Sequence, residues 1–576
     1  MSKSSPATTT VGELLLSRLA DLGVRHIFGL PGDYNMEFLD QIEAYDGIDW
    51  IGNCNEMNAA YAADGYGRLA GIAAMVTTFG PGELSVVNGL AGAMAESVPI
   101  VSIVGGPTME IMDRRASMHH SLGDGDFDRW VRIAREVTVA QATLSPGNAD
   151  AEIDRVLGEC WTQRRPVYLR LPGDVAHQPV AMPAGGGAPP AAARWGAPRA
   201  ALENAAQRLL AGAVCPALLV GNLPLRYGLG AEIASFLTER HWPAATQSLG
   251  RGLIDESSPN YVGIYNGGDS VEPVRQVIEG ADVLVCVGTK FFDWDGLFTA
   301  DLDPRRIITI GRGSCAVAGQ IFEPVAPDAA LARLHTIAPT RSVDWPTAAD
   351  PGRAPDARLD PASNRPITQA RFWPALATIL EEGDIIVPET GTSSFGVGSI
   401  RLPRNAVCVQ APLWGAIGYA IPAAFGAATA SPDRRIVLIT GDGSLQLTVQ
   451  EISRMMALGQ RPIIFVMNNA GYTVERVVNG PHQPYNDIDN WRYADLPAVF
   501  NREVAIDSHL VSTEGELADV LDRLHGVPAR PTVVEVLVDQ QDLPAGMPQW
   551  GKETTAVDYQ TTLRAEPKLS WRGLPG

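Results

Sequence analysis

Two kinds of apolar spacing alternate along this chain. Residues 435–440 and 462–467 are short, mainly apolar runs, which are typical of parallel strands buried on both faces. Between them, residues 445–456 place apolar side chains three or four positions apart, which is the spacing of an amphipathic helix. The pattern predicts a strand–helix–strand unit in which the loop after each strand lies at one edge of a parallel sheet.

The same alternation extends over most of the chain and is interrupted twice. Residues 182–198 are rich in Pro, Gly and Ala, and residues 338–366 are rich in Pro and Asp, so both are expected to be linkers. Residues 1–10, rich in Ser and Thr, are expected to fray. The pattern predicts an α/β protein with three doubly wound parallel-sheet domains. The predicted domains are 1–182, 199–338 and 367–545, followed by a tail at 546–576.

Composition narrows the class of protein. A chain of 576 residues is too long to fold around a single hydrophobic core. Its content of 45% hydrophobic and 19% charged residues is typical of a soluble globular protein. A formal net charge of −20 argues against nucleic acid or an acidic membrane surface as a partner. The six cysteines form no CxxC pair, and neither a signal peptide nor a long apolar span is evident. We therefore expect a cytoplasmic protein with reduced thiols.

Small and polar residues follow both strands of the predicted unit. Gly441, Asp442 and Gly443 come after the first strand, and Asn468 and Asn469 come after the second. Taken singly, the first group could be an ordinary turn and the second a helix cap. Together they place a carboxylate and an amide oxygen beside glycines that admit a phosphate group closely. The combination indicates a metal-bridged diphosphate anchor.

Residues 441–475, GDGSLQLTVQEISRMMALGQRPIIFVMNNAGYTVE, resemble the diphosphate-binding motif of thiamine diphosphate enzymes. The ending NNAGYTVE is most similar to the 2-keto acid decarboxylases, which include indolepyruvate, phenylpyruvate and branched-chain enzymes and are related to pyruvate decarboxylase. The resemblance covers nearly the whole chain. It implies thiamine diphosphate and Mg²⁺ as cofactors, and a pyrimidine-binding, a central and a diphosphate-binding domain in that order.

The resemblance also implies which residues bind the cofactors. Asp442, Asn469 and the carbonyl of Gly471 would hold Mg²⁺. The loop around Trp414 would grip the aminopyrimidine, with Ile417 as an apolar wedge, although an ordinary core position would also explain an isoleucine. The implied cofactor-binding residues are Thr390, Gly391, Thr392, Ser393, Gly415, Ile417, Gly441, Asp442, Gly443, Ser444, Asn469, Gly471 and Tyr472.

Five ionisable side chains are the implied catalytic residues: Asp33, Glu56, His119, His120 and Glu475. Each has an ordinary alternative, because glutamate complements a helix dipole, aspartate serves in turns, and histidines occur in polar loops. In the family, the glutamate matching Glu56 bonds the pyrimidine ring and drives activation of the cofactor. The other four would manage the substrate carboxylate and supply the proton that replaces CO₂.

Three positions depart from the usual family pattern. Ser394 stands where pyruvate-specific enzymes have a bulky aromatic residue, and Ala416 stands where His or Ser is usual. Thr390 matches the pyruvate enzymes, whereas indolepyruvate enzymes tend to have Gln. The small side chain at 394 predicts a pocket wider than one built for pyruvate. The residues expected to line it are Ser394, Phe395, Trp414 and Val474.

The function expected from the resemblance is non-oxidative decarboxylation of a bulky 2-keto acid, aromatic or branched, to an aldehyde. Three alternatives stay open: carboligation to an acyloin or hydroxyketone with an acceptor aldehyde, a catalytically silent regulatory paralogue, and a flavoprotein similar to acetohydroxyacid synthase. The intact ionisable residues argue against the second, and the histidine pair argues against the third. In this superfamily two subunits share each active site, so a homodimer or a dimer of dimers, that is a homotetramer, is expected.

One further motif is discounted. Residues 546–552, GMPQWGK, match most of a phosphate-binding P-loop, but Glu553 follows where Ser or Thr should bind the metal. No strand-to-helix pattern surrounds the segment. Nucleotide binding at this position is therefore not expected.

Overall fold

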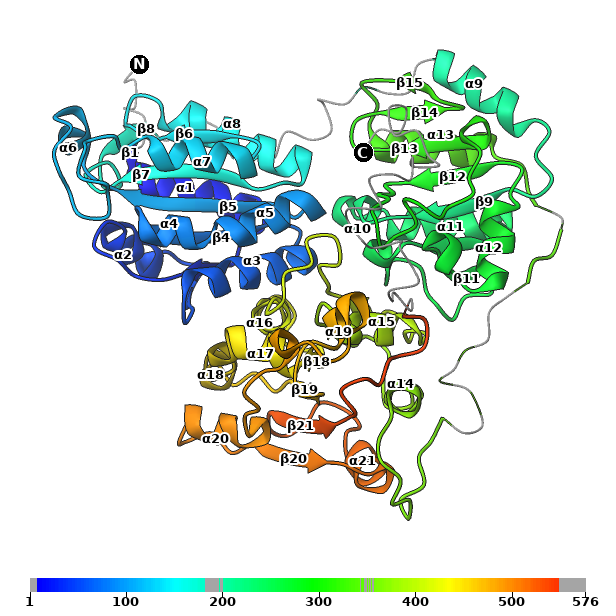
Figure 1. Ribbon diagram of the computed structural model, residues 1–576. Coiled ribbons are helices and arrows are strands. Elements are labelled where there is room, and N and C mark those ends of the chain that lie inside the picture. The colour runs from blue at the N-terminus through cyan, green and yellow to red at the C-terminus, as the bar shows by residue number, and fades with distance from the viewer. Residues whose placement is uncertain are drawn as a thin grey trace. The chain divides into compact units, whose positions relative to one another are not determined.

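Three β-sheets with flanking helices dominate the structure, a computed structural model (Figure 1). It describes residues 8–181, 196, 200–341, 343–346, 350, 352, 354 and 357–547. The predicted linker 182–198, except Gly196, lies outside the described residues, as does the predicted tail beyond Met547 with most of the P-loop-like segment. No helix in the described part of the chain combines the length and apolarity needed to cross a bilayer.

The first sheet has six parallel strands, as predicted for the first domain. Their spatial order is β3 (Asp49–Gly52), β2 (His26–Gly29), β4 (Ala73–Thr78), β5 (Ile100–Gly106), β7 (Val167–Pro172) and β6 (Gln141–Thr143). The helices are α1 (Val11–Asp21), α2 (Met36–Ala44), α3 (Glu56–Ala70), α4 (Pro81–Ser85), α5 (Val87–Glu96), α6 (Met109–Asp113), α7 (Arg129–Val137) and α8 (Ala149–Gln163). A short antiparallel pair, β1 (Thr8–Thr10) with β8 (Pro179–Ala181), corrects the expectation that residues 8–10 fray.

The second sheet has seven strands and is only partly parallel. Their order is β11 (Tyr261–Ile264), β10 (Ala244–Thr246), β9 (Ala217–Val220), β12 (Leu284–Val287), β13 (Ile307–Ile310), β14 (Cys315–Val317) and β15 (Gln320–Phe322). The helices are α9 (Ala200–Leu210), α10 (Leu223–Tyr227), α11 (Gly230–Arg240), α12 (Glu272–Glu279) and α13 (Pro327–Ile337). Strands β14 and β15 form antiparallel pairs, which the apolar pattern missed because a three-residue strand carries no sign of its direction.

The third sheet has six parallel strands and carries the two loops singled out in the sequence. Their order is β17 (Val407–Cys408), β16 (Ile385–Pro388), β18 (Ile436–Gly441), β19 (Ile463–Asn468), β21 (Thr532–Leu537) and β20 (Asp507–Val511). The helices are α14 (Gln369–Ala377), α15 (Thr392–Gly398), α16 (Ala420–Ala430), α17 (Asp442–Thr448), α18 (Ile452–Ala457), α19 (Thr473–Asn479), α20 (Leu496–Phe500) and α21 (Glu514–Leu521). Because β16, β18 and β19 are parallel neighbours, the loops after them share one edge of the sheet.

The helix predicted at 445–456 starts earlier and is broken. Helix α17 begins at Asp442, a 3₁₀ turn covers Val449–Glu451, and α18 follows. An aspartate in the first turn complements the positive end of the helix, which accounts for the earlier start. The 3₁₀ turn tightens the chain locally between the two helices.

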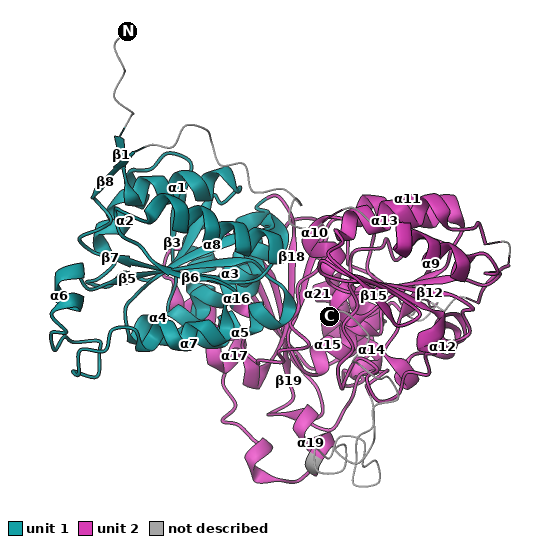
Figure 2. Cartoon of the chain, turned by 90° about the horizontal axis from the view of Figure 1, so that it is seen from above, with its two compact units in different colours: residues 1–193, 422–432, 450–458 teal, residues 194–421, 433–449, 459–576 magenta. Residues whose placement is uncertain are grey.

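The chain divides into two compact units that differ from the predicted domains (Figure 2). Unit 1 contains residues 1–193, 422–432 and 450–458, and unit 2 contains the rest. Most of α16 therefore groups with the first sheet. A Cβ added to Gly426 would lie 1.8 Å from the carbonyl oxygen of Ala62 in α3, so only glycine allows the two backbones to approach this closely. Apolar periodicity does not report such a contact between two helices.

Candidate active site

Asp442 is the first residue of α17 and directly follows β18. Its side chain is buried, Oδ1 accepts a hydrogen bond from the Gly443 N–H (2.8 Å), and Oδ2 accepts one from the Gly471 N–H (3.2 Å). Burial raises the pKa of Asp442 to about 6, and hydrogen bonds from these N–H groups partly oppose the rise. A buried carboxylate fixed by two loops is suited to bind a cation.

The Asp442 carboxylate and two further oxygen atoms converge at one point. The side-chain oxygen of Asn469 lies 3.2 Å from Asp442 Oδ1 and 2.7 Å from the Gly471 carbonyl oxygen. Adjacent oxygen ligands at roughly 2.0–2.1 Å from an octahedral cation lie about 2.9 Å apart. The amide nitrogen faces the Thr473 hydroxyl oxygen (3.0 Å), which can accept because it donates its own proton to the Gln540 carbonyl (2.8 Å). Turning the amide over would make hydrogen bonds instead, but the oxygen spacing fits a small hard cation.

The loops before α15 and α17 offer donors for a diphosphate group. Gly391 precedes α15, whose first residues Thr392 and Ser393 are buried, and Gly443 and Ser444 lie in the first turn of α17. A Cβ on Gly443 would lie 2.5 Å from the ring of Tyr472, so a larger residue there would displace that ring. Backbone N–H and hydroxyl groups in such loops are typical ligands of phosphate oxygens.

Glu389, which the sequence pattern did not single out, supports these loops. It is fully buried immediately after β16, and its carboxylate accepts hydrogen bonds from the N–H groups of Thr390 (3.0 Å) and Ala420 (3.2 Å). Burial raises its pKa to about 7. The sequence shows Glu389 only as a glutamate directly after an apolar strand. Such a glutamate is usually interpreted as a surface residue, so it was not predicted to belong to the site.

Helix α19 carries Glu475 on an exposed side and Arg476 on a buried side. The Arg476 guanidinium donates to the carbonyls of Asn469 (3.3 Å) and Ala470 (2.8 Å) and pairs with Asp487 (2.9 Å). It therefore holds the loop that presents the converging oxygens. The sequence prediction missed Arg476 because nothing in the local pattern marks an arginine as buried.

The predicted aminopyrimidine loop lies between β17 and α16. Trp414 is exposed, Ile417 is half-buried, and Gly415 has a φ of 68°, in the left-handed region that favours glycine. The structure thus places this loop in unit 2 with the diphosphate loops, and the contacts predicted for it stay a prediction.

Asp33, His119 and His120 form one cluster in unit 1. Their ligand atoms lie within 4.8 Å of one another, with His119 Nε2 2.5 Å from Asp33 Oδ2 and His120 Nδ1 4.0 Å from Asp33 Oδ1. The Tyr34 hydroxyl lies 3.3 Å from His119 Nδ1, and the two rings are stacked with centroids 4.9 Å apart. The aspartate and the tyrosine orient the imidazole of His119, an arrangement suited to proton transfer.

Glu56 is the first residue of α3 and is half-buried. The side chain of Asn55 caps the helix by accepting from the Asn58 N–H (2.8 Å). A Cβ on Gly82 would lie 3.4 Å from Glu56 Oε1, so the glycine after Pro81 leaves room beside the carboxylate. The helix start therefore fixes the backbone of Glu56.

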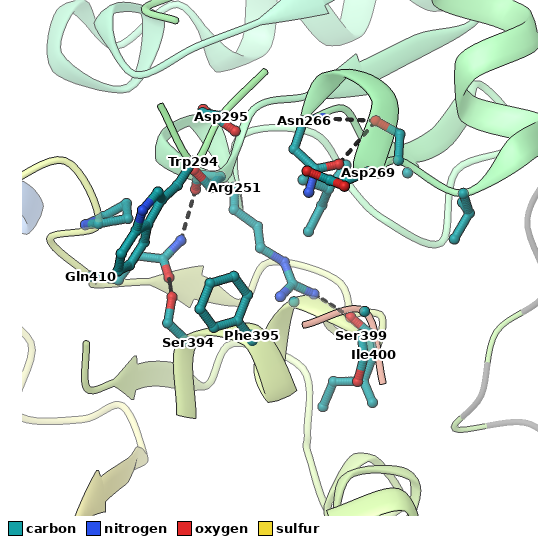
Figure 3. Close-up of a pocket in the computed structure, with 18 of the residues that line it drawn as sticks. Arg251, Asn266, Asp269, Trp294, Asp295, Ser394, Phe395, Ser399, Ile400 and Gln410 are labelled. Atoms are coloured by element: carbon teal, nitrogen blue, oxygen red, sulfur yellow. Dashed lines mark hydrogen bonds between the residues drawn. The ribbon is translucent and has the colours of Figure 1, made fainter. Parts of the chain in front are cut away.

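A cavity of about 350 Å³ lies within unit 2, beside Ser394 and Phe395 of α15 (Figure 3). The Ser394 hydroxyl donates to Gln410 Oε1 (3.2 Å), and Gln410 Nε2 donates to the Ser248 carbonyl (2.8 Å). The rings of Trp294 and Phe395, which both line the cavity, contact each other with centroids 5.8 Å apart. The space beside the small side chain at 394 is therefore real and is bounded by aromatic rings.

The lining of this cavity differs from the predicted pocket. Trp414 and Val474 are not among its lining residues, whereas Phe292, Trp294 and Asp295 from the loop after β12 are. Burial raises the pKa of Asp295 to about 7, with Ser248 opposing the rise. The sequence prediction missed these residues because contact between a loop of the central sheet and α15 depends on tertiary packing.

Comparison with known proteins agrees with this geometry. Three segments match the thiamine pyrophosphate enzymes: residues 9–126 the N-terminal TPP binding domain, 203–322 the central domain, and 390–536 the C-terminal TPP binding domain. Proteins named "Alpha-keto-acid decarboxylase" from Mycobacterium tuberculosis (strain ATCC 25618 / H37Rv) and Mycobacterium bovis (strain BCG / Pasteur 1173P2) are each 46% identical over 546 residues, 93% of this chain and 95% of theirs. One of the same name from Mycobacterium avium (strain 104) is 45% identical over 540 residues, 93% of this chain and 95% of its own.

These matches confirm the predicted mixed α/β fold in three domains and the binding of thiamine diphosphate. The flavoprotein alternative finds no support in them. On the family descriptions and the extent of identity together, the chain belongs to the thiamine diphosphate-dependent 2-keto acid decarboxylase family.

Proposed function

We propose that this decarboxylase acts on a bulky 2-keto acid, aromatic or branched, and releases the corresponding aldehyde. The observation that carries the proposal is the cavity of about 350 Å³ beside Ser394, with aromatic walls at Phe292, Trp294 and Phe395. At ~25 cal/mol per Å² of apolar surface, burying a phenyl group there in place of a methyl group would gain a few kcal/mol.

Mg²⁺ would bind at the three converging oxygens of Asp442, Asn469 and Gly471. The donor set fits, because one carboxylate, one amide oxygen and one carbonyl leave positions for diphosphate oxygens and water. The loops at 391–393 and 443–444 would donate to the remaining diphosphate oxygens. When bound, thiamine diphosphate supplies the carbon nucleophile that adds to the keto carbon and takes up the electron pair released with CO₂.

Glu56 would exchange a proton with the pyrimidine ring of the cofactor and so promote formation of the nucleophile. His119, oriented by Asp33 and Tyr34, would deliver a proton to the carbon that loses CO₂. His120 and Glu475 would act on the substrate carboxylate and on the same proton transfer. These roles follow from the family resemblance, and the cluster geometry around Asp33 supports them.

We further infer a homodimer or a dimer of dimers in which Glu56 and the Asp33 cluster of one chain serve the diphosphate anchor of another. The inference rests on the sharing of sites in the family. The exposure of the Asp33 and His119 side chains within one chain agrees with it.

A panel of 2-keto acids tests the substrate proposal. Phenylpyruvate, indolepyruvate and branched 2-keto acids should exceed pyruvate in kcat/KM. Ser394→Trp should shift the preference toward pyruvate by filling the cavity, and Trp294→Ala should relax discrimination among large side chains. Analysis of both aldehyde and hydroxyketone products, with and without added aldehyde, separates decarboxylation from carboligation.

Ser235→Trp provides the matched control, because Ser235 is exposed on α11 and does not line the cavity. Its substrate profile should equal that of the wild type. A wild-type preference for pyruvate, or a Ser394→Trp variant with an unchanged profile, would contradict the proposal.

A further inference from the structure

Glu451, a buried carboxylate outside the groups described so far, bonds to the chain around the start of α3, where Glu56 lies. It lies in the turn between α17 and α18, and residues 450–458 belong to unit 1 (Figure 2). Its carboxylate accepts three hydrogen bonds, from Asn53 Nδ2 (2.7 Å), the Cys54 N–H (3.2 Å) and Asn58 Nδ2 (2.8 Å). These donors flank Glu56 on both sides in the sequence.

Asn53 extends this network to a second loop. Its Oδ1 accepts from the N–H of Gly29 (3.1 Å), the last residue of β2, which leads into the loop with Asp33. Because Oδ1 is engaged there, the Asn53 amide cannot turn over without breaking that bond. The Asn53 Nδ2 group therefore points toward Glu451 Oε1, which must accept its hydrogen bond.

Further contacts of residues 450–454 also bond this segment to the chain around the start of α3. Asn58 keeps its Nδ2 toward Glu451 although its Oδ1 has no hydrogen-bond partner in the described structure. Arg454 donates to the Gly52 carbonyl (2.8 Å), and the Cys54 thiol donates to the Gln450 carbonyl (3.3 Å). Residues 450–454 are thus bonded to the chain immediately before α3.

Burial of the Glu451 carboxylate costs free energy, which its hydrogen bonds offset only when they are well aligned. Burial raises the pKa of Glu451, and the hydrogen bonds from Asn58, Asn53 and Cys54 oppose that rise. A buried carboxylate is stable only when donors form hydrogen bonds to its oxygens. Small movements of Asn53, Cys54 or Asn58 relative to Glu451 are therefore costly.

We propose that Glu451 is a positioning residue for Glu56: it fixes the start of α3, and through Asn53 the end of β2, so that the Glu56 carboxylate meets the pyrimidine ring in the geometry that proton exchange requires. The inference rests on the proposed role of Glu56. It assigns no contact between Glu451 and substrate or cofactor.

Polarity exchange provides the sharpest test. In Glu451→Gln, the new amide nitrogen would face Asn53 Nδ2, donor against donor. In Asn53→Asp, two carboxylates would face each other. In the double variant, the new carboxylate at position 53 would accept from both the new amide nitrogen at position 451 and the Gly29 N–H. The amide oxygen at position 451 would still accept from Cys54 and Asn58. Both single variants should be impaired, and the double variant should recover.

The measurement is hydrogen–deuterium exchange at C2 of thiamine diphosphate bound to the full-length holoenzyme with Mg²⁺. Exchange should slow between ~10- and ~100-fold in Glu451→Gln, the order expected when a reacting group is slightly misplaced. Cofactor affinity should stay unchanged, and the double variant should regain most of the rate. Glu96→Gln is the control, because Glu96 is buried and pairs with Arg68 (2.8 Å) elsewhere in unit 1. It should lower the Tm without slowing exchange.

Glu56→Gln in the same assay separates the two proposals. Wild-type exchange in Glu56→Gln would overturn the role of Glu56 and the positioning role with it. Slow exchange in Glu56→Gln but wild-type exchange in Glu451→Gln would overturn positioning alone. If Glu451→Gln fails to fold, a folded and active double variant still supports the inference, and a double variant no better than the single one contradicts it.

Discussion

The two groups of candidate site residues, one in each unit, differ in how deeply a single chain buries their side chains. In unit 2, Asp442 and Asn469 are 1% and 4% exposed, and N–H groups of Gly443 and Gly471 donate to the Asp442 carboxylate. In unit 1, the side chains of Asp33, His119 and His120 are 46%, 55% and 29% exposed. The proposed diphosphate anchor is therefore buried within its own unit, whereas the proposed acid–base cluster is partly exposed.

We attribute this difference in exposure to the charges that each group is proposed to bind or transfer. A cation and a diphosphate carry permanent charge, so their ligands act best when buried and oriented in advance. Groups that transfer protons must titrate near the working pH and reach the reacting atoms, which favours partial exposure until another surface covers them. The two groups should consequently fail in different ways when altered.

Glu56→Gln should have the largest effect and should act on activation alone. The amide keeps the shape of the side chain but cannot exchange the proton, so C2 exchange should slow by ~10²–10⁴-fold. Titration calorimetry should show normal binding of thiamine diphosphate with Mg²⁺. Exchange at the wild-type rate would remove Glu56 from the mechanism.

Asp442→Ala should act on cofactor binding. It removes the charged member of the oxygen set, and because loss of an outer-sphere partner alone costs roughly 10–100-fold in metal affinity, a loss of at least ~100-fold is expected. Asp433→Ala is the control, since Asp433 is an exposed aspartate just before β18. Wild-type cofactor affinity in Asp442→Ala would show that the anchor lies elsewhere.

A smaller effect is expected on the pH dependence of stability, where one buried glutamate from each unit can be compared. Burial raises the pKa of Glu83 in unit 1 and of Glu389 in unit 2 to about 7, against 4.5 for an ordinary glutamate. The folded state therefore holds protons that the unfolded chain has released. The stabilising contribution of each group is complete below about pH 4.5 and is lost as the pH rises through about 7.

Glu83→Gln should abolish its share of this pH dependence, about 3 kcal/mol for a pKa difference of about 2.5. Glutamine can accept from the Gly80 N–H and donate to the Tyr168 hydroxyl oxygen, which replace the present bonds of 2.8 Å each. The variant should therefore unfold at a higher Tm than the wild type at pH 8. Glu389→Gln should lower the Tm, because its partners are all N–H donors. Equal Tm shifts for both variants would contradict this contrast.

Local spacing was enough to predict much of the fold. The strands expected at 435–440 and 462–467 are β18 and β19, which lie within a residue of those positions. Their parallel register then brings the Gly-Asp-Gly loop beside Asn469 and Gly471, because neighbouring parallel strands end at one edge. The Asp33 cluster was expected through the family resemblance, and the structure brings its three members together.

The residues that were missed share one property. Glu389, Arg476, Trp294 and Glu451 derive their roles from partners in other elements, and in isolation each has an ordinary surface or core interpretation. Burial of a charged side chain depends on donors or acceptors that tertiary packing supplies, and period-based reasoning does not contain that information.

Complementation between two inactive variants tests the central contrast most directly. When Glu56→Gln and Asp442→Ala chains carrying different tags are co-expressed, half of randomly paired dimers are mixed. If one chain supplies Glu56 to the anchor of the other, each mixed dimer has one intact site, and aldehyde formation should recover to about a quarter of the wild-type rate. If both groups of a site came from the same chain, every site would carry one change, and the mixture would stay as inactive as either variant alone.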